Sequence, residues 1–220
     1  ADTRIYAGLS QGFRAPNLSD LTSELTDSGI YSPTPDLEPE HYVQFELGAK
    51  AERGDWKGEA AVYYTQIRDM IVASPTGVFL AGVPFLTKSN VGDGTLYGVE
   101  LRGERQLSAD WTAFAVASWQ DGRIDQFTAG GFKVTEPSSR LMPITMVVGA
   151  TYQPEGANWW VTADSYLADE ADQLSLKDLT DTQRIPPGGT PGYGILGVRC
   201  GKQLTDRCTM RATDIVGVDF

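Results

Sequence analysis

The chain has 220 residues, of which 41% are hydrophobic and 10% aromatic, and its formal net charge is −11. This composition is that of a folded protein. The acidic balance argues against nucleic-acid binding, which needs basic patches to neutralise phosphates. No apolar run approaches the roughly 20 residues of a membrane helix, although strands can cross a membrane without one. The chain begins at Ala1 with a strand pattern, so we expect a mature product, a fragment or part of a longer polypeptide.

The dominant hydrophobic pattern has period two, which is typical of strands with one apolar and one polar face. Most of the predicted strands exceed the five or six residues common in soluble proteins and suit the roughly 9–11 residues that cross a bilayer at a tilt. In chain order they are Arg4–Phe13, Glu40–Glu52, Lys57–Val72, Leu96–Leu107, Trp111–Ile124, Ile144–Gln153, Asn158–Ala168, Gly192–Gln203 and Cys208–Ile215.

Short and long connections alternate strictly between these strands, which is typical of an outer-membrane barrel with tight periplasmic turns and long outer loops. The predicted long loops are Asn17–Pro39, Ala73–Thr95, Asp125–Pro143 and Asp169–Pro191. Tryptophans and tyrosines near the strand ends indicate aromatic girdles at the two membrane interfaces. Alternating charges on the other strand face predict a polar lumen; they are Glu46, Lys50, Glu100, Arg102 and Glu104.

Several segments, in order, resemble the C-terminal barrel of TonB-dependent receptors. The first resembles the family's GFRAP signature, and the others resemble its NP-x-L-x-PE, ELG-x-K and GVE elements; a Tyr63-Tyr64 segment resembles its YY…I-x-D-x-I strand. The residues that carry the main motifs are Gly12, Phe13, Arg14, Ala15, Pro16, Leu37, Pro39, Glu40, Glu46, Gly48, Gly98 and Glu100.

The resemblance implies an all-β antiparallel transmembrane barrel, with residues 1–220 forming about nine strands of the C-terminal portion of a 22-stranded barrel and the plug domain outside this chain. It also implies active import of a scarce nutrient across the outer membrane of a Gram-negative-type bacterium, powered through TonB. An iron chelate (siderophore or haem) is the expected cargo, with cobalamin or a carbohydrate behind it. No enzymatic step, cofactor or resident metal is expected. A passive porin and a soluble β-sandwich module are the alternatives.

Individual residues carry less information than these patterns. Four aromatics in the outer loops are the predicted ligand contacts: Tyr31, Phe79, Phe85 and Phe127. Cys200 and Cys208 would face each other across a hairpin centred near Leu204, so a disulfide and two free thiols both stay open. The lone His41 is expected at the rim or facing the lumen, and the glycine-rich run at Gly192 lacks the following helix that a dinucleotide site requires.

Overall fold

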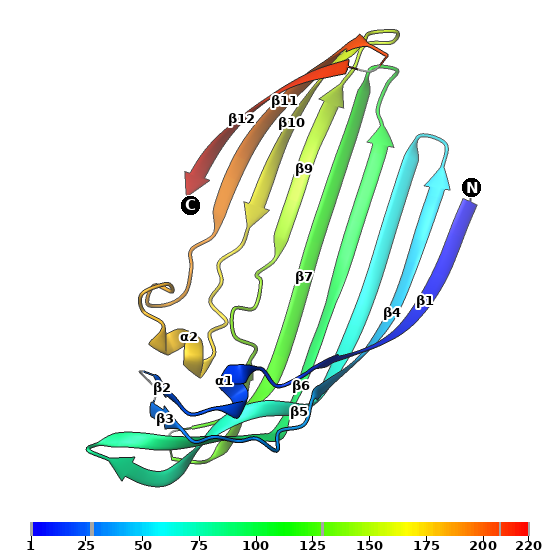
Figure 1. Ribbon diagram of the computed structural model, residues 1–220. Coiled ribbons are helices and arrows are strands. Elements are labelled where there is room, and N and C mark those ends of the chain that lie inside the picture. The colour runs from blue at the N-terminus through cyan, green and yellow to red at the C-terminus, as the bar shows by residue number, and fades with distance from the viewer. Residues whose placement is uncertain (1, 27–28, 129, 207, 220) are drawn as a thin grey trace.

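The computed structural model describes residues 2–26, 29–128, 130–206 and 208–219. Nine long antiparallel strands form a single curved sheet in which each strand lies beside its neighbours in the chain (Figure 1). These strands are β1 (Asp2–Arg14), β4 (Glu40–Arg53), β5 (Trp56–Leu80), β6 (Val83–Gln106), β7 (Trp111–Phe127), β9 (Thr145–Tyr152), β10 (Trp159–Ala168), β11 (Tyr193–Thr205) and β12 (Cys208–Asp219).

All nine predicted strands are therefore confirmed. The short turns gather at one end of the sheet and three of the four predicted long connections lie at the other, whereas the fourth, between β5 and β6, is a two-residue turn (Figure 1). The sheet is one continuous path rather than two stacked layers, so the soluble-sandwich alternative is wrong. No helix among the described residues is long and apolar enough to span a membrane.

The strand register separates an apolar face from a polar one. On the apolar face Leu9 pairs with Phe45, and Phe45 pairs with Tyr64. Apolar side chains on this face stay open to the surroundings; Ile5, for example, is 76% exposed. Lipid stabilises such a surface, whereas water would not. The five predicted lumen charges lie on the opposite face, where the cavities between strands also open.

Two rows of aromatics border the apolar face. At the short-turn end Tyr152 packs between Trp111 and Trp159, with ring centroids 4.9 and 5.8 Å apart. Towards the loop end Tyr97 and Trp119 form an edge-on pair at 5.8 Å. Trp111 and Trp119 are eight residues apart on β7, which corresponds to about 20 Å of height for a strand tilted near 40°. This spacing fits the apolar band of an outer-membrane barrel.

On the lumen face, aromatic rings lie over glycines of the neighbouring strand. Four directly opposed pairs share this arrangement: Tyr6 with Gly48, Tyr63 with Gly98, Phe114 with Gly149 and Trp160 with Gly201. A Cβ at any of these glycines would collide with the ring opposite. Such pairing covers exposed backbone and fixes the register, which explains the glycines of the ELG-x-K and GVE motifs.

The region Ala73–Thr95 is not the long loop that the sequence predicts. β5 and β6 continue as a hairpin to a two-residue turn, in which Ala81 and Gly82 both have positive φ angles of 51° and 85°. The ladder shifts at Met70, next to Asp69 with φ 57°. Beyond this bulge the hairpin bends away from the direction of the membrane strands and passes across the loop end of the sheet (Figure 1).

The other long segments carry short elements of their own. Residues 17–39 contain α1 (Leu18–Leu21), β2 (Glu24–Thr26) and β3 (Gly29–Tyr31), and β3 pairs parallel with the β6 half of the hairpin. β8 (Lys133–Pro137) pairs with the outer part of β7, and α2 (Leu176–Thr180) lies in the segment between β10 and β11.

Candidate functional site at the loop end of the sheet

An ion-paired cluster, the rim clasp, is formed by Arg14, Asp20, Glu40 and Lys88. Arg14 and Glu40 are opposite each other in the β1–β4 ladder. The Arg14 guanidinium donates to both Glu40 carboxylate oxygens, at 2.7 Å from Nε and 2.6 Å from Nη2. Glu40 also accepts from the backbone amide of Ile71 at 2.9 Å. The arginine of the GFRAP motif and the glutamate of the PE motif thus join β1, β4 and the base of the hairpin.

Asp20 extends the rim clasp to the first long loop. Its carboxylate accepts from Arg14 Nη1 at 2.9 Å and from Lys88 Nζ at 3.2 Å, and it caps the start of α1 by accepting from the Asn17 amide. Lys88 also donates to the Ser19 carbonyl at 2.8 Å. The loop and the hairpin are therefore held as one unit.

Asp20 belongs to α1 in the first long segment, outside the long strands of the sheet. Burial alone would raise the pKa of Asp20, but hydrogen bonds from Asn17, Arg14 and Lys88 outweigh it and lower that pKa below its ordinary value. Asp20 is therefore ionised at neutral pH.

A second cluster locks the last two long segments together. Asp178, in α2, accepts at 2.7 Å from the Ser139 hydroxyl, at 3.2 Å from the Arg140 amide, and from the amide and hydroxyl of Ser175. Burial opposes ionisation of Asp178, but these bonds prevail and lower its pKa. Glu136, at the end of β8, accepts from the Leu176 amide at 2.8 Å.

Between these locked segments lies the loop-end pocket, a cavity of about 360 Å³ on the lumen side of β9, β10 and β11. Its residues come from 140–145, from the end of β10, from 169–191 and from the start of β11. Tyr166 and Tyr193 face each other within it, with ring centroids 5.8 Å apart. Mostly apolar concave sites of this size with a few polar groups are typical of small-molecule binding.

None of the four predicted ligand contacts lines the loop-end pocket. Phe79 is at the hairpin tip and 65% exposed, and Phe85 pairs with Ile30. Tyr31 lies under Lys88, whose Nζ is 4.8 Å from the ring centroid, and Phe127 pairs with Lys133. These aromatics belong to the hairpin and its neighbours, and their contact with a ligand stays a prediction.

The cysteine pairing is not formed. Both thiols are free and exposed, and the register sets Cys200 opposite Ala212 and Cys208 opposite Thr205. The hairpin turns about two residues later than the predicted centre at Leu204, which offsets the cysteines along the ladder. His41 lies at the rim as expected, but it pairs with Phe13 and Arg68 on the outward face rather than towards the lumen.

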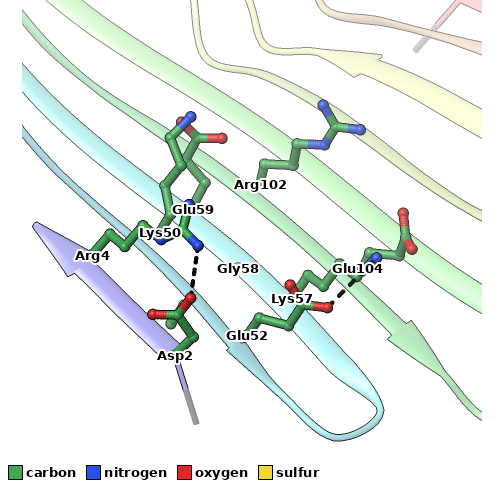
Figure 2. Close-up of a pocket in the computed structure, with 10 residues that line it drawn as sticks. Asp2, Arg4, Lys50, Glu52, Lys57, Gly58, Glu59, Arg102 and Glu104 are labelled. Carbon is green, nitrogen blue, oxygen red and sulfur yellow. Dashed lines mark hydrogen bonds and ion pairs between the residues drawn. The ribbon is translucent and has the colours of Figure 1, made fainter.

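The lumen wall near the short-turn end carries charges of both signs. Lys50 and Glu59 form an ion pair at 2.6 Å, and Arg102 and Glu104 project from β6 beside them (Figure 2). These side chains line a cavity of about 400 Å³, and a second of about 510 Å³ lies between Tyr6, Glu46 and Glu100. Among the described residues no group of three or more His, Cys, Asp or Glu is arranged to hold a metal.

A curved antiparallel sheet with an apolar outer band, two aromatic rows, a charged inner wall and all long segments at one end is typical of the wall of an outer-membrane β-barrel. Residues 1–213 match the family model described as TonB dependent receptor-like, beta-barrel. The chain belongs to this family, whose members are outer-membrane receptors and transporters rather than enzymes. The resemblance to TonB-dependent receptors is thereby confirmed, while the parts assigned to the individual motif residues stay predictions.

Individual relatives share only a low sequence identity with this chain. The pesticin receptor of Yersinia enterocolitica is 26% identical over 112 residues, which are 50% of this chain and 15% of that receptor. Among solved structures, the copper transporter OprC has a TM-score of 0.70 at 18% sequence identity. The siderophore receptor PirA from Pseudomonas aeruginosa has a TM-score of 0.62, also at 18% sequence identity. Each comparison covers 96% of this chain, which spans 30% and 35% of those two proteins. The likeness at this identity concerns the fold.

Proposed function

We propose that this chain forms part of the wall of an outer-membrane receptor that imports an iron chelate, with energy supplied through TonB. The observation that carries the proposal is the arrangement of the loop end, where the rim clasp and the Asp178 cluster hold four outer segments in fixed positions around the mouth. A receptor needs such preorganised segments, because ordering mobile loops upon binding would reduce affinity.

The charged lumen wall supports active rather than passive transport. Lys50, Glu59, Arg102 and Glu104 alternate in sign along neighbouring strands (Figure 2). A surface of mixed sign suits a folded, polar plug domain that is held by many weak contacts and can be displaced. A selective open pore uses rings of one sign instead. The passive porin is therefore the less favoured function.

The choice of an iron chelate rests on the relatives. Solved neighbours include the siderophore receptor PirA and the ferric yersiniabactin receptor FyuA of Yersinia pestis, the latter with a TM-score of 0.57. The copper transporter OprC among the neighbours makes a copper cargo the second candidate.

Uptake by cells tests this proposal. The full-length protein is expressed in a Gram-negative host that lacks its own chelate receptors, and radioactive iron is supplied as ferric enterobactin, ferric yersiniabactin or haem. We expect accumulation of at least one of these cargoes in TonB-positive cells and none in an isogenic TonB-deficient strain. Equal accumulation in both strains would identify a passive channel. Accumulation of copper but of none of the iron cargoes would identify the second candidate.

A further inference from the structure

The wall of the sheet is interrupted beside β7, at the level of the outer aromatic row. β7 pairs with β9 as far as Ser118 and with β8 from Arg123 onward. Between these two ladders the described residues form one backbone hydrogen bond across the gap, from the Ser138 amide to the Gly122 carbonyl at 2.9 Å. Residues 119–122 of β7 and the facing segment 139–144 are here named the wall seam.

The segment that faces β7 in the wall seam does not continue the ladder. Arg140 has φ 56°, a left-handed conformation that turns the chain out of the strand direction. Its amide donates to the Asp178 carboxylate at 3.2 Å rather than to β7. Pro143 has no amide hydrogen to donate, and the Ile144 carbonyl accepts from the Asp169 amide at 2.9 Å. The interruption is therefore built into the backbone.

A cavity of about 110 Å³ lies in the wall seam. It is lined by Trp119 and Gln120, two consecutive residues whose side chains face opposite sides of the sheet. Trp119 contacts Tyr97 on the apolar face, whereas Gln120 accepts from the Tyr63 hydroxyl at 3.1 Å on the lumen face. The cavity thus lies within the thickness of the wall. The residues that it shares with the loop-end pocket are Leu141, Met142, Pro143, Asp169, Ala171 and Gln173.

Exposed apolar side chains surround the wall seam. Trp119 is 39%, Met142 56% and Ile144 47% exposed. Trp119 belongs to the outer aromatic row, which marks the outer interface of the membrane. The seam is therefore continuous with the lipid-facing surface on one side and with the mostly apolar loop-end pocket on the other. Water in such a passage would keep apolar surface hydrated, which is unfavourable, whereas a hydrocarbon chain would cover it.

The charged groups around the cavity select the head group of such a molecule. Three exposed carboxylates line the cavity, those of Asp169, Glu170 and Asp172, and none of the described lysines or arginines does. An anionic head group would be repelled here, and a cationic one would be attracted. The ring of Trp119 adds a surface on which an ammonium group is stabilised.

We propose that the wall seam takes up the hydrocarbon chain of a single-chain amphiphile from the outer leaflet, with a cationic head group beside residues 169–172. The chain lies between Trp119 and Met142 and reaches towards the loop-end pocket. The choice of occupant follows from the continuity of the seam with the lipid-facing surface. This inference goes beyond the proposed function, because such binding needs neither TonB nor an iron chelate.

Photo-crosslinking of the full-length protein in lipid bilayers tests the proposal. The probe is dodecylamine with a diazirine at the end of its chain, and the labelled residues are mapped by mass spectrometry. We expect labels on residues 141–143 and 171–173. Labels confined to outward strand residues such as Met146 and Leu196 would overturn the proposal. A dodecanoate probe with the same diazirine should label the seam roughly tenfold less, the size of one charged contact, and equal labelling would overturn the assigned head group.

A matched pair of variants tests the contact with the chain. Met142→Ser and Met146→Ser each replace an exposed methionine, but only Met142 lines the cavity. Met142→Ser should lower labelling of residues 171–173 roughly fivefold, the size of about one methylene contact, and Met146→Ser should not. Equal loss in the two variants would overturn the proposal.

Competition on the unaltered protein guards against misfolded variants. Unlabelled dodecylamine should reduce labelling of the seam but not of the lipid-facing strands, whereas butylamine, which has the head group without the long chain, should not compete. Equal competition by butylamine would show a simple cation site, and no competition by dodecylamine would show random lipid contact. Either result would overturn the proposal.

Discussion

Removal of the Glu40 carboxylate tests whether the rim clasp stabilises the barrel. Glu40 is 4% exposed and accepts from Arg14 twice, from the Tyr42 hydroxyl at 2.5 Å and from the Ile71 amide at 2.9 Å. Glu40→Ala leaves the Ile71 amide and the Arg14 guanidinium without this partner. The other strand residues keep their ladder, so the effect should be confined to the loop end.

The magnitude follows from burial. Removing one partner of a fully buried ion pair costs about 3–5 kcal/mol. The Arg14 side chain is 39% exposed and also contacts Asp20, so water and Asp20 still stabilise its charge after Glu40 is removed. We therefore expect the free energy of unfolding to fall by only about 2–3 kcal/mol. Glu40→Gln keeps one acceptor oxygen for the Ile71 amide but loses the charge and the second acceptor for Arg14, so it should lose about 1–2 kcal/mol.

Urea unfolding of the full-length protein in lipid vesicles, followed by tryptophan fluorescence, measures these losses. Glu38→Ala is the matched control, since Glu38 is an exposed carboxylate two residues away. Arg14→Gln combined with Glu40→Gln should lose less than the sum of the single changes, because the two residues contact each other. A loss below about 0.5 kcal/mol for Glu40→Ala, typical of an ordinary surface change, would refute a stabilising clasp.

Three further predictions concern separate parts of the sheet. Gly98→Ala should reduce the amount of folded barrel on heat-modifiability gels, because its Cβ would lie 2.6 Å from a backbone oxygen of the next strand, whereas Gly103→Ala, with nothing within 4 Å, should not. Asp20 has a lowered pKa, so its stabilisation is present above the ordinary aspartate pKa and is lost as the pH falls through the lowered value. Limited proteolysis with an acid-active protease should therefore cut its loop faster at low pH, and an Asp20→Asn protein should show less of this dependence. Cys200 and Cys208 should each add one maleimide to the unreduced, denatured protein in a mass spectrum, and the absence of labelling would show a disulfide.

The membrane part of the fold is readable from the sequence because its physical constraint is local. Each residue faces either lipid or the lumen, so alternation in a strand such as Glu40–Arg53 specifies both its existence and its faces. The hairpin beyond Val72 is not predicted, because neither of its faces contacts lipid there. Its sequence therefore does not need to alternate between apolar and polar residues. Pro75, Gly77 and Gly82 also read as loop residues there, although the sheet accommodates them at an irregular ladder and a turn.

The candidate site is only partly predictable from the sequence, because it depends on contacts between segments that are far apart in the chain. The Arg14 and Glu40 motifs identify important residues, but their contact depends on a strand register that sets them face to face. The loop-end pocket joins Arg140, Tyr166 and Arg184 from segments far apart in the chain. A choice of aromatics by loop membership alone selects Phe79 and its neighbours, because nothing local indicates which loops meet.

The bend of the β5–β6 hairpin at Asp69 separates the direction of this arm from its length. Asn90 donates to the Asp69 and Glu38 carbonyls at 2.8 and 2.7 Å and so fastens the bulge to the neighbouring chain. The contacts at the base of the hairpin therefore set its direction. The number of residues before the turn at its tip sets its length. Residue pairs added or removed near Ala81 would lengthen or shorten the arm without redirecting it, so the outermost part of the protein can change in size while the entrance beneath it keeps its shape.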